Sequence, residues 1–155
     1  MSDRKRVLFV CHGNICRSPM AEFIMKDIVR RNGASDRYVI DSCATSSEAL
    51  GQDMYPPARA ELEEKGIPFE SRRAKRMTPG MYDDYDVIAV MDTNNRSNIA
   101  PYVRGDPGHK VKLLMQYAGV SGEIDDPWYT GDFETAYDEI TEGCLALYDY
   151  LEGSI

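Results

Sequence analysis

Residues 7–19 constrain the fold more than any other stretch of this 155-residue chain. They begin with a continuous apolar run, residues 7–10, which is typical of a short strand that is buried on both faces. Pro19 suits the first position of a helix, and Ser18 before it is a candidate helix cap. Apolar residues then recur at helical spacing. The stretch therefore predicts a tight loop, residues 11–17, that joins a strand to the N-terminus of a helix.

A loop of this kind can bind a phosphate-sized anion. Backbone N–H groups in a compact turn can point inward together, and the helix dipole adds partial positive charge. Gly13 and Asn14 suit the unusual backbone angles that we expect in such a turn. Arg17 can bind two phosphate oxygens with its planar guanidinium. Cys11 would lie beneath the anion, where these donors and the Ser18 hydroxyl favour a thiolate that can attack phosphorus.

The alternative is that Cys11 is a buried structural cysteine and Arg17 a surface residue at the start of a helix. A cysteine and an arginine six positions apart mean little by themselves, because such a pair is common by composition. The strand before the loop, the Gly-Asn pair within it and the Ser-Pro pair after it favour the functional interpretation.

The run from Val10 to Pro19 resembles the active-site loop of the low-molecular-weight protein tyrosine phosphatases. The resemblance covers essentially the whole chain and implies that Cys11 is the nucleophile. It assigns phosphate binding to the loop residues His12, Gly13, Asn14, Ile15, Cys16, Arg17 and Ser18. It also implies that Ser42 and Ser18 support Asn14, and that Asp92 lies near the mouth of the pocket.

A leaving phenolate or alkoxide needs a proton, and the run Asp125 to Tyr129 is the best candidate source. It combines carboxylates on a loop stiffened by Pro127 with two aromatic residues that can stack on a phenyl ring. From the residues alone, a solvated acidic loop is the favoured interpretation. The family resemblance reverses that preference and implies that Asp126 is the general acid, with Trp128 and Tyr129 lining the substrate crevice.

Short apolar runs alternate with helical patterns along the chain. We expect strands over residues 7–10, 38–40 (ending in the polar run 41–44), 87–91 and 111–114. We expect helices over residues 19–33, over 58–65, from a cap at 92 or 93 to before 101, and along an apolar stripe from 133 to 151. The pattern predicts an α/β fold, with residues 1–155 forming a single phosphatase domain. Its four-stranded parallel sheet should carry helices on both faces, a three-layer, doubly wound arrangement of the Rossmann or flavodoxin type.

Charge and composition limit the classes of partner that we expect for this protein. The formal net charge of −8 argues against nucleic acid, and no stretch resembles a signal peptide or could span a membrane. We therefore expect a cytoplasmic protein that does not bind membranes. The four cysteines show no zinc-type pairing, and the expected chemistry needs neither a metal nor a cofactor. We expect the protein to be a monomer.

Several residues depart from the family pattern. Glu48 stands where many relatives carry an aromatic wall residue and makes one side of the substrate crevice less apolar. Arg72 stands where relatives carry a histidine that supports the loop asparagine, but a solvated basic face over residues 72–76 is the favoured interpretation. We expect His12 to be a pocket wall rather than a base, and His109 to lie in a surface loop.

Cys16 has two interpretations. A lone buried cysteine is most often structural, whereas many relatives form a reversible disulfide between the positions of Cys11 and Cys16. Such a bond would protect a reactive thiolate from irreversible oxidation, and the redox role is the favoured one.

The resulting prediction is a metal-independent phosphatase acting on phosphotyrosine proteins or small aryl phosphates through a cysteinyl-phosphate intermediate. A related arsenate reductase is one alternative, but residues 78–91 lack the relay cysteines that it needs. A protein-arginine phosphatase is another, disfavoured because such relatives typically carry threonine in place of Ile15. A phosphate-binding module without turnover is the least favoured, since a pure binder has no use for the acid at Asp126.

Overall fold

The computed structural model describes residues 4–120 and 122–153, which build one four-stranded sheet. Strand β1 (Lys5–Cys11) lies between β2 (Tyr38–Ala44) and β3 (Val87–Val90), and β4 (Val111–Leu113) forms the far edge. All three pairings are parallel. The predicted parallel sheet is therefore confirmed, with the order β2-β1-β3-β4.

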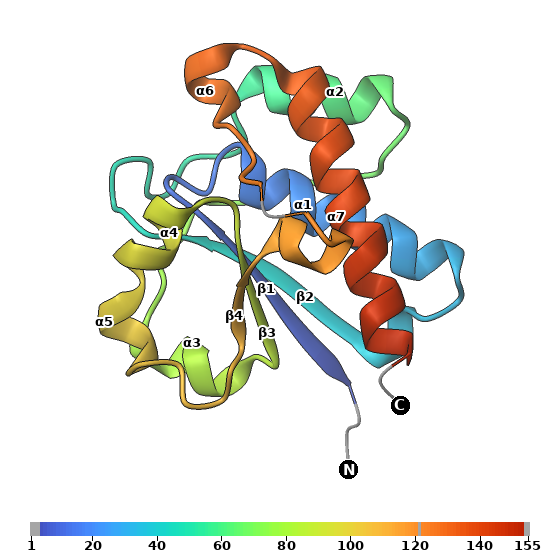
Figure 1. Ribbon diagram of the computed structural model, residues 1–155. Helices are drawn as coiled ribbons and strands as arrows, with labels where there is room; N and C mark the ends of the chain where they lie inside the picture. The colour runs from blue at the N-terminus through green and yellow to red at the C-terminus, as the bar shows by residue number, and fades with distance from the viewer. Residues whose placement is uncertain (1–3, 121, 154–155) are drawn as a thin grey trace.

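Helices cover both faces of this sheet, as Figure 1 shows. The side chains of β1 alternate between two apolar clusters, with Val7 and Phe9 on one face and Leu8 and Val10 on the other. The first cluster includes side chains of α1 (Arg17–Arg31), α2 (Pro56–Glu64) and α7 (Phe133–Gly153). The second includes side chains of α3 (Pro79–Asp84) and α5 (Ala100–Val103), and Ile99, which follows α4 (Thr93–Asn98). The three layers follow from strands that are apolar on both faces.

Short elements complete the chain. They are the 3-10 turns η1 (Ser35–Arg37) and η2 (Leu114–Ala118), and the single-turn helix α6 (Pro127–Thr130) inside the acidic loop. Helices α3 and α6 were not expected, and the helix after Asp92 is followed by α5, whose first turn contains Pro101. None of the helices in the described part of the chain is long and apolar enough to cross a membrane.

The prediction that Ser18 caps α1 is wrong. The helix begins at Arg17, so Cys16 occupies the cap position and no side chain caps the first turn. Ser18 is wholly buried inside the first turn, where its hydroxyl bonds to side chains of the loop instead. The prediction placed Pro19 at the first helical position, but it is the third. A proline is tolerated there because the backbone N–H groups of the first turn have no partner within the helix.

The order of the sheet places one loop at a topological switch point. From β1 the chain crosses to β2 on one side, and the later strand β3 lies on the other side. In open parallel sheets, ligands bind beyond the carboxyl ends of the strands at such a point. Cys11 is the last residue of β1, so the loop that follows it lies where this rule expects a ligand.

Candidate active site

The loop between β1 and α1 is held in shape by Asn14. This residue adopts a left-handed conformation with φ of 59° and is wholly buried. Gly13, by contrast, does not have a left-handed φ. A Cβ added there would make only ordinary contacts, at 3.6 and 3.8 Å, so the backbone does not require glycine at this position. Asn14 alone therefore adopts the unusual backbone angles that the sequence predicted for both residues.

The side-chain amide of Asn14 ties the loop to two neighbouring elements. Its Nδ2 donates to the hydroxyls of Ser18, at 2.8 Å, and Ser42, at 2.9 Å. Its Oδ1 accepts from the guanidinium of Arg72 and from the backbone N–H of Lys75, the latter at 3.2 Å. Every donor and acceptor of this buried amide is used, which favours one conformation of the loop.

The contact with Asn14 overturns the expectation that Arg72 belongs to a solvated basic face. Arg72 is part-buried, whereas Arg73, Lys75 and Arg76 are exposed as predicted. Burial lowers the pKa of Arg72, while the nearby carboxylate of Glu22 and other negative groups oppose that shift. The arginine packs inward because Asn14 offers its carbonyl oxygen as an acceptor.

The sulfur of Cys11 lies against the first turn of α1. Its Sγ is 3.0 Å from the hydroxyl oxygen of Ser18, and it accepts the backbone N–H of Ser18 at 3.4 Å. Cys11 itself is nearly inaccessible, with 3% of its surface exposed at the base of the pocket. The backbone N–H of Ser18 thus donates to the sulfur at the N-terminal end of a helix, and the Ser18 hydroxyl can donate as well once Cys11 is a thiolate. The helix dipole there also favours negative charge.

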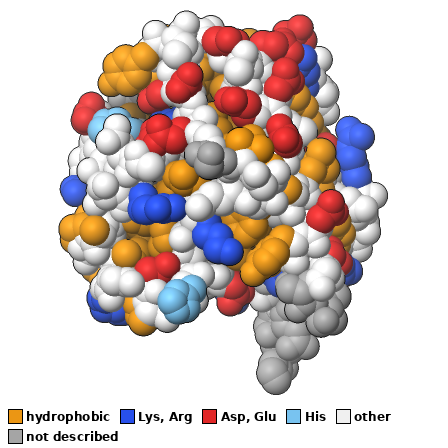
Figure 2. Space-filling view, in the orientation of Figure 1, with side chains coloured by type: hydrophobic (Ala, Val, Ile, Leu, Met, Phe, Trp, Pro, Cys, Tyr) orange, Lys and Arg blue, Asp and Glu red, His pale blue; other side chains and the backbone are white. Residues whose placement is uncertain are grey.

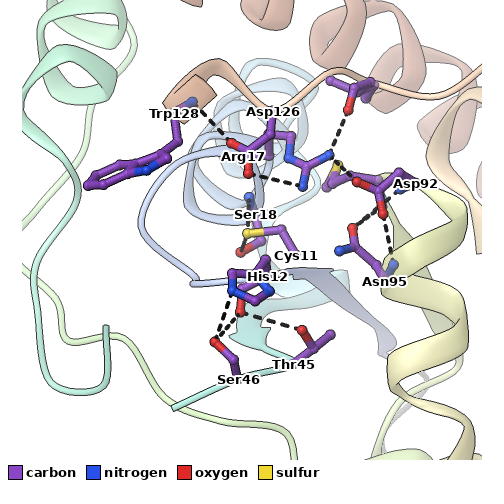
Figure 3. A network of polar contacts seen from close by, with 12 residues as sticks. Cys11, His12, Arg17, Ser18, Thr45, Ser46, Asp92, Asn95, Asp126 and Trp128 are labelled. Carbon is purple, nitrogen blue, oxygen red and sulfur yellow. Dashed lines mark hydrogen bonds and ion pairs between the residues drawn. The ribbon is translucent and has the colours of Figure 1, made fainter. Parts of the chain in front are cut away.

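Arg17 bridges the loop to the acidic residues on the other side of the site. Its Nη1 donates to Asp92 Oδ2 at 2.8 Å and to the carbonyl oxygen of Ile124 at 2.6 Å, and its Nη2 lies 3.6 Å from Asp126 Oδ2. Figure 3 shows the Asp126 and Asp92 side chains on opposite sides of the guanidinium. Burial alone lowers the pKa of Arg17, but the neighbouring Cys11, Asp126 and Asp92 raise it above its usual value. The guanidinium is therefore charged, and its buried Nε finds no acceptor among the described residues.

Asp126 is placed by the short helix α6. Its Oδ1 accepts the backbone N–H of Trp128 at 3.1 Å and so caps that helix. The Trp128 ring packs on Tyr55 with 4.5 Å between centroids and remains half exposed, while Tyr129 is 80% exposed. The acidic loop is thus an ordered turn that presents a carboxylate and two aromatic rings, rather than a solvated loop without structure.

A pocket of about 180 Å³ opens above the Cys11 sulfur. It is lined by Cys11, His12, Gly13, Ile15, Cys16, Glu48, Ala49, Gln52, Asp126, Trp128 and Tyr129. Ala49 and Gln52 were not predicted, because they lie in a loop whose residue types carry no chemical signal. Asp92 is absent from this lining and lies on the far side of Arg17. The pocket joins a thiol, an aspartate and an aromatic rim.

His12 forms part of the pocket wall. Its Nε2 lies 2.8 Å from Glu48 Oε2, and its backbone carbonyl accepts the N–H of Ser46 at 3.1 Å. The ring is engaged by a side chain at the rim rather than by Cys11 or Asp126. His109 lies in an exposed loop away from the pocket, as expected.

Cys16 is buried under the loop. Burial, followed by the charge of Cys11, raises the pKa of the Cys16 thiol far above its usual value. All four cysteines are free thiols in this structure. Cys16 is thus a neutral thiol, suited to neither nucleophilic attack nor metal binding.

One carboxylate cluster outside the pocket has metal-ligand spacing among the described residues: Glu61, Glu64 and Glu134, on α2 and α7. The ammonium of Lys65 lies 2.5 Å from Glu134 and 3.9 Å from Glu61. Lys65 thus pairs with two of the three carboxylates and offsets part of their charge, which weakens the attraction of this cluster for a metal ion.

Residues 6–154 match the family model described as low molecular weight phosphotyrosine protein phosphatase. The low molecular weight protein-tyrosine-phosphatase YfkJ of Bacillus subtilis is 34% identical over 143 residues, covering 91% of this chain and 92% of that protein. The protein-tyrosine-phosphatase PtpA of Staphylococcus aureus (strain MRSA252) is 35% identical over 145 residues, covering 94% and 92%.

Solved structures share the architecture. The crystal structure of YfkJ matches with a TM-score of 0.93 and 31% identity, covering 97% of this chain and 96% of that one. The crystal structure of a Drosophila arginine phosphatase matches with a TM-score of 0.83 and 30% identity, covering 94% and 96%. A protein named as a tyrosine phosphatase and one named as an arginine phosphatase therefore share this fold.

Proposed function

This chain belongs to the low molecular weight phosphotyrosine protein phosphatase family, and on that premise we propose that it hydrolyses phosphotyrosine monoesters through a phosphate ester of Cys11. The observation that carries the proposal is that Cys11 and Asp126 line one pocket, while Arg17 lies beside it with its guanidinium 3.6 Å from Asp126. A thiol at a helix N-terminus, a charged guanidinium and a carboxylate are the parts that phosphoryl transfer to a cysteine needs.

In the first step, the Cys11 thiolate attacks phosphorus in line with the ester oxygen. An S–P bond forms while the P–O bond to the tyrosyl oxygen breaks, and the Asp126 carboxyl donates its proton to that leaving oxygen. The loop N–H groups and Arg17 stabilise the charge on the three equatorial oxygens. Asp126 is placed for this role because it caps α6 and lines the same pocket as Cys11.

In the second step, water attacks the cysteinyl phosphate. Asp126, now a carboxylate, takes a proton from the water, and the S–P bond breaks to release inorganic phosphate and the thiolate. The Ser18 hydroxyl, 3.0 Å from the sulfur, donates to the departing thiolate. Both steps use side chains of this chain alone, and we propose that no metal or cofactor takes part.

A phenyl ring fits this pocket better than a guanidinium group. Ile15 lines the wall beside the loop, and Trp128 and Tyr129 form an aromatic rim. An apolar wall favours an aromatic ring, whereas a polar phosphoarginine group would lose hydrogen bonds to water there. We therefore propose phosphotyrosine rather than phosphoarginine as the substrate, although a relative of each kind shares the fold.

We propose a protective role for Cys16 rather than a catalytic one. It lines the same pocket as Cys11, so a sulfenic acid on Cys11 could condense with this thiol to a disulfide, releasing water. After peroxide treatment, a reductant should restore the activity of the wild type but not of Cys16→Ser. Equal recovery in the two proteins would contradict this role.

We further propose that residues 1–155 act as one phosphatase domain, monomeric and cytoplasmic, without nucleic-acid partners. The family match over residues 6–154 and the net charge of −8 support these proposals. Light scattering would test the monomer.

The direct test is phosphate release from a phosphotyrosine peptide by the reduced protein, with a chelator present and Cys11→Ser as control. We expect turnover by the wild type and none by the variant, which should still bind phosphate. No turnover by a folded, reduced wild type would contradict the proposal, and phosphoarginine and arsenate would then be assayed.

A further inference from the structure

A second hollow adjoins the catalytic pocket on the side of α4. Its volume is about 250 Å³, and it shares His12, Asp126 and Tyr129 with the catalytic pocket. The rest of its lining comes from Arg17 and from the segment after β3: Asp92, Asn94, Asn95 and Asn98. A substrate whose phosphate occupies the loop would therefore have its neighbouring residues within reach of this hollow.

The accessible charge in this hollow is negative. Asp92 contributes a carboxylate, and Asp126 contributes a second one whenever it does not hold the proton for the leaving group. Both are paired with Arg17, but their side chains are 18% and 21% exposed, whereas Arg17, the one Lys or Arg in the lining, is 2% exposed. A bound phosphate would also offset the charge of Arg17. On the face drawn in Figure 2, acidic side chains gather over the region of α6 and the start of α7, beside the site. The surroundings therefore repel a second anion.

Three asparagines line the hollow, and the side chains of two of them have no hydrogen-bond partner among the described residues. Asn95 is buried and its Oδ1 accepts the backbone N–H groups of Met91 and Asp92, at 3.1 and 3.3 Å. The side chains of Asn94 and Asn98 are exposed and bond to none of the residues that the structure describes. Their carbonyl oxygens can accept hydrogen bonds from an ammonium or guanidinium group.

We propose that this hollow is a subsite for a lysine or arginine side chain adjacent to the phosphotyrosine of a substrate protein. The proposal rests on the proposed function, which places the phosphate on the loop at Cys11. The carboxylates attract the cation and the amides of Asn94 and Asn98 accept its N–H groups. A glutamate at the same place in the substrate would be repelled, and small aryl phosphates would not reach the hollow.

The test compares three phosphotyrosine peptides that differ only in the residues flanking the phosphotyrosine, which are lysine, glutamine or glutamate. Their dissociation constants are measured with Cys11→Ser, so that binding is observed without turnover. At low salt we expect the lysine peptide to bind about tenfold more tightly than the glutamate peptide, with glutamine between them. The difference should shrink at high salt.

The net charge of the whole protein also favours cationic peptides, so matched variants are needed. Asn98→Lys adds a positive charge inside the hollow, and Ser97→Lys adds the same charge at the preceding, exposed residue, which lies outside its lining. We expect Asn98→Lys to reduce the preference for lysine to about threefold or less, and Ser97→Lys to leave it nearly unchanged. Asn94→Lys provides a second placement of the charge within the hollow.

The outcomes separate the two proposals. Equal binding of the lysine and glutamate peptides, or equal effects of Asn98→Lys and Ser97→Lys, would overturn the subsite. Phenyl phosphate turnover by the otherwise unaltered enzyme should be unchanged in Ser97→Lys, which lies outside the lining. Failure of the wild type to hydrolyse phenyl phosphate would instead contradict the proposed function, and the peptide binding would still decide the subsite.

Discussion

The Ser18 hydroxyl oxygen lies 3.0 Å from the Cys11 sulfur and also accepts a hydrogen bond from Asn14 Nδ2 at 2.8 Å. A thiolate can only accept hydrogen bonds, so the Ser18 proton points to the sulfur whenever Cys11 is ionised. One hydroxyl group therefore both supports the loop and stabilises the nucleophile.

Replacing Ser18 by alanine should slow turnover, and it leaves Ser42 as the one remaining acceptor for Asn14 Nδ2. A hydrogen bond to a charged group contributes about 1.5–3 kcal/mol, so we expect kcat to fall roughly 10- to 100-fold with little change in phosphate affinity. Steady-state kinetics and phosphate inhibition measure the two quantities. An unchanged kcat would show that this hydroxyl does not assist the thiolate.

Replacing Asp126 by asparagine removes the proton but keeps an oxygen that can cap α6. We expect the loss of kcat/KM to be about 10²–10⁴-fold for phenyl phosphate, and smaller for an aryl phosphate with a more acidic phenol, because such a leaving group needs less protonation. The control is Asp125→Asn, next to it in the chain. Equal losses on both substrates would count against Asp126 as the general acid.

Replacing Arg72 by alanine should cost both stability and activity. The Oδ1 of the buried Asn14 would keep only the N–H of Lys75, and a weakened buried hydrogen bond costs about 1–3 kcal/mol of unfolding free energy. The exposed neighbour provides a control, since Arg73→Ala should change stability by about 0.5 kcal/mol at most. Denaturant unfolding of the two variants measures the difference, and equal stabilities would contradict the assigned contact.

Asp106 gives a pH-dependent prediction remote from the active site. Burial alone raises its pKa, but hydrogen bonds from the Tyr82 hydroxyl and the backbone N–H groups of Lys110 and Val111 lower it below the usual value. A carboxyl with a depressed pKa stabilises the fold above its unfolded pKa of about 3.9, and this stability is lost as pH falls through the folded pKa.

The corresponding variant is Asp106→Asn, because asparagine also tolerates the left-handed φ of 56° at this position. We expect it to be less stable than the wild type by about 1–2 kcal/mol at pH 7, with the gap closing as pH falls below about 4. Thermal unfolding across this range measures it, with the exposed Asp83→Asn as control. A gap that stays constant with pH would mean that the carboxylate charge is not responsible.

The sequence predicted the fold where its patterns were long or unambiguous. The apolar run before Cys11 and the helical spacing after Pro19 fixed the loop between β1 and α1, and four strands separated by helices implied the parallel sheet. Helices α3 and α6 escaped prediction because four to six residues are too few to show a helical period.

The parts of the site that the sequence could not predict depend on contacts between residues far apart in the chain. Arg72 and Asn14 are 58 positions apart, and no local pattern distinguishes an arginine that turns inward from its solvated neighbours. The adjoining hollow likewise depends on residues of α4 and of the Asp126 loop that line the same space, which the chain order alone does not specify. Asp126 was assigned through family resemblance because an acidic loop by itself favours a solvated interpretation.

The most direct measurement is mass spectrometry of the enzyme quenched during turnover of an aryl phosphate. We expect one phosphoryl group on the peptide that contains Cys11, appearing within a single turnover and absent from Cys11→Ser. Phosphate release by the wild type with no phosphoryl group on Cys11, or continued turnover by Cys11→Ser, would contradict it.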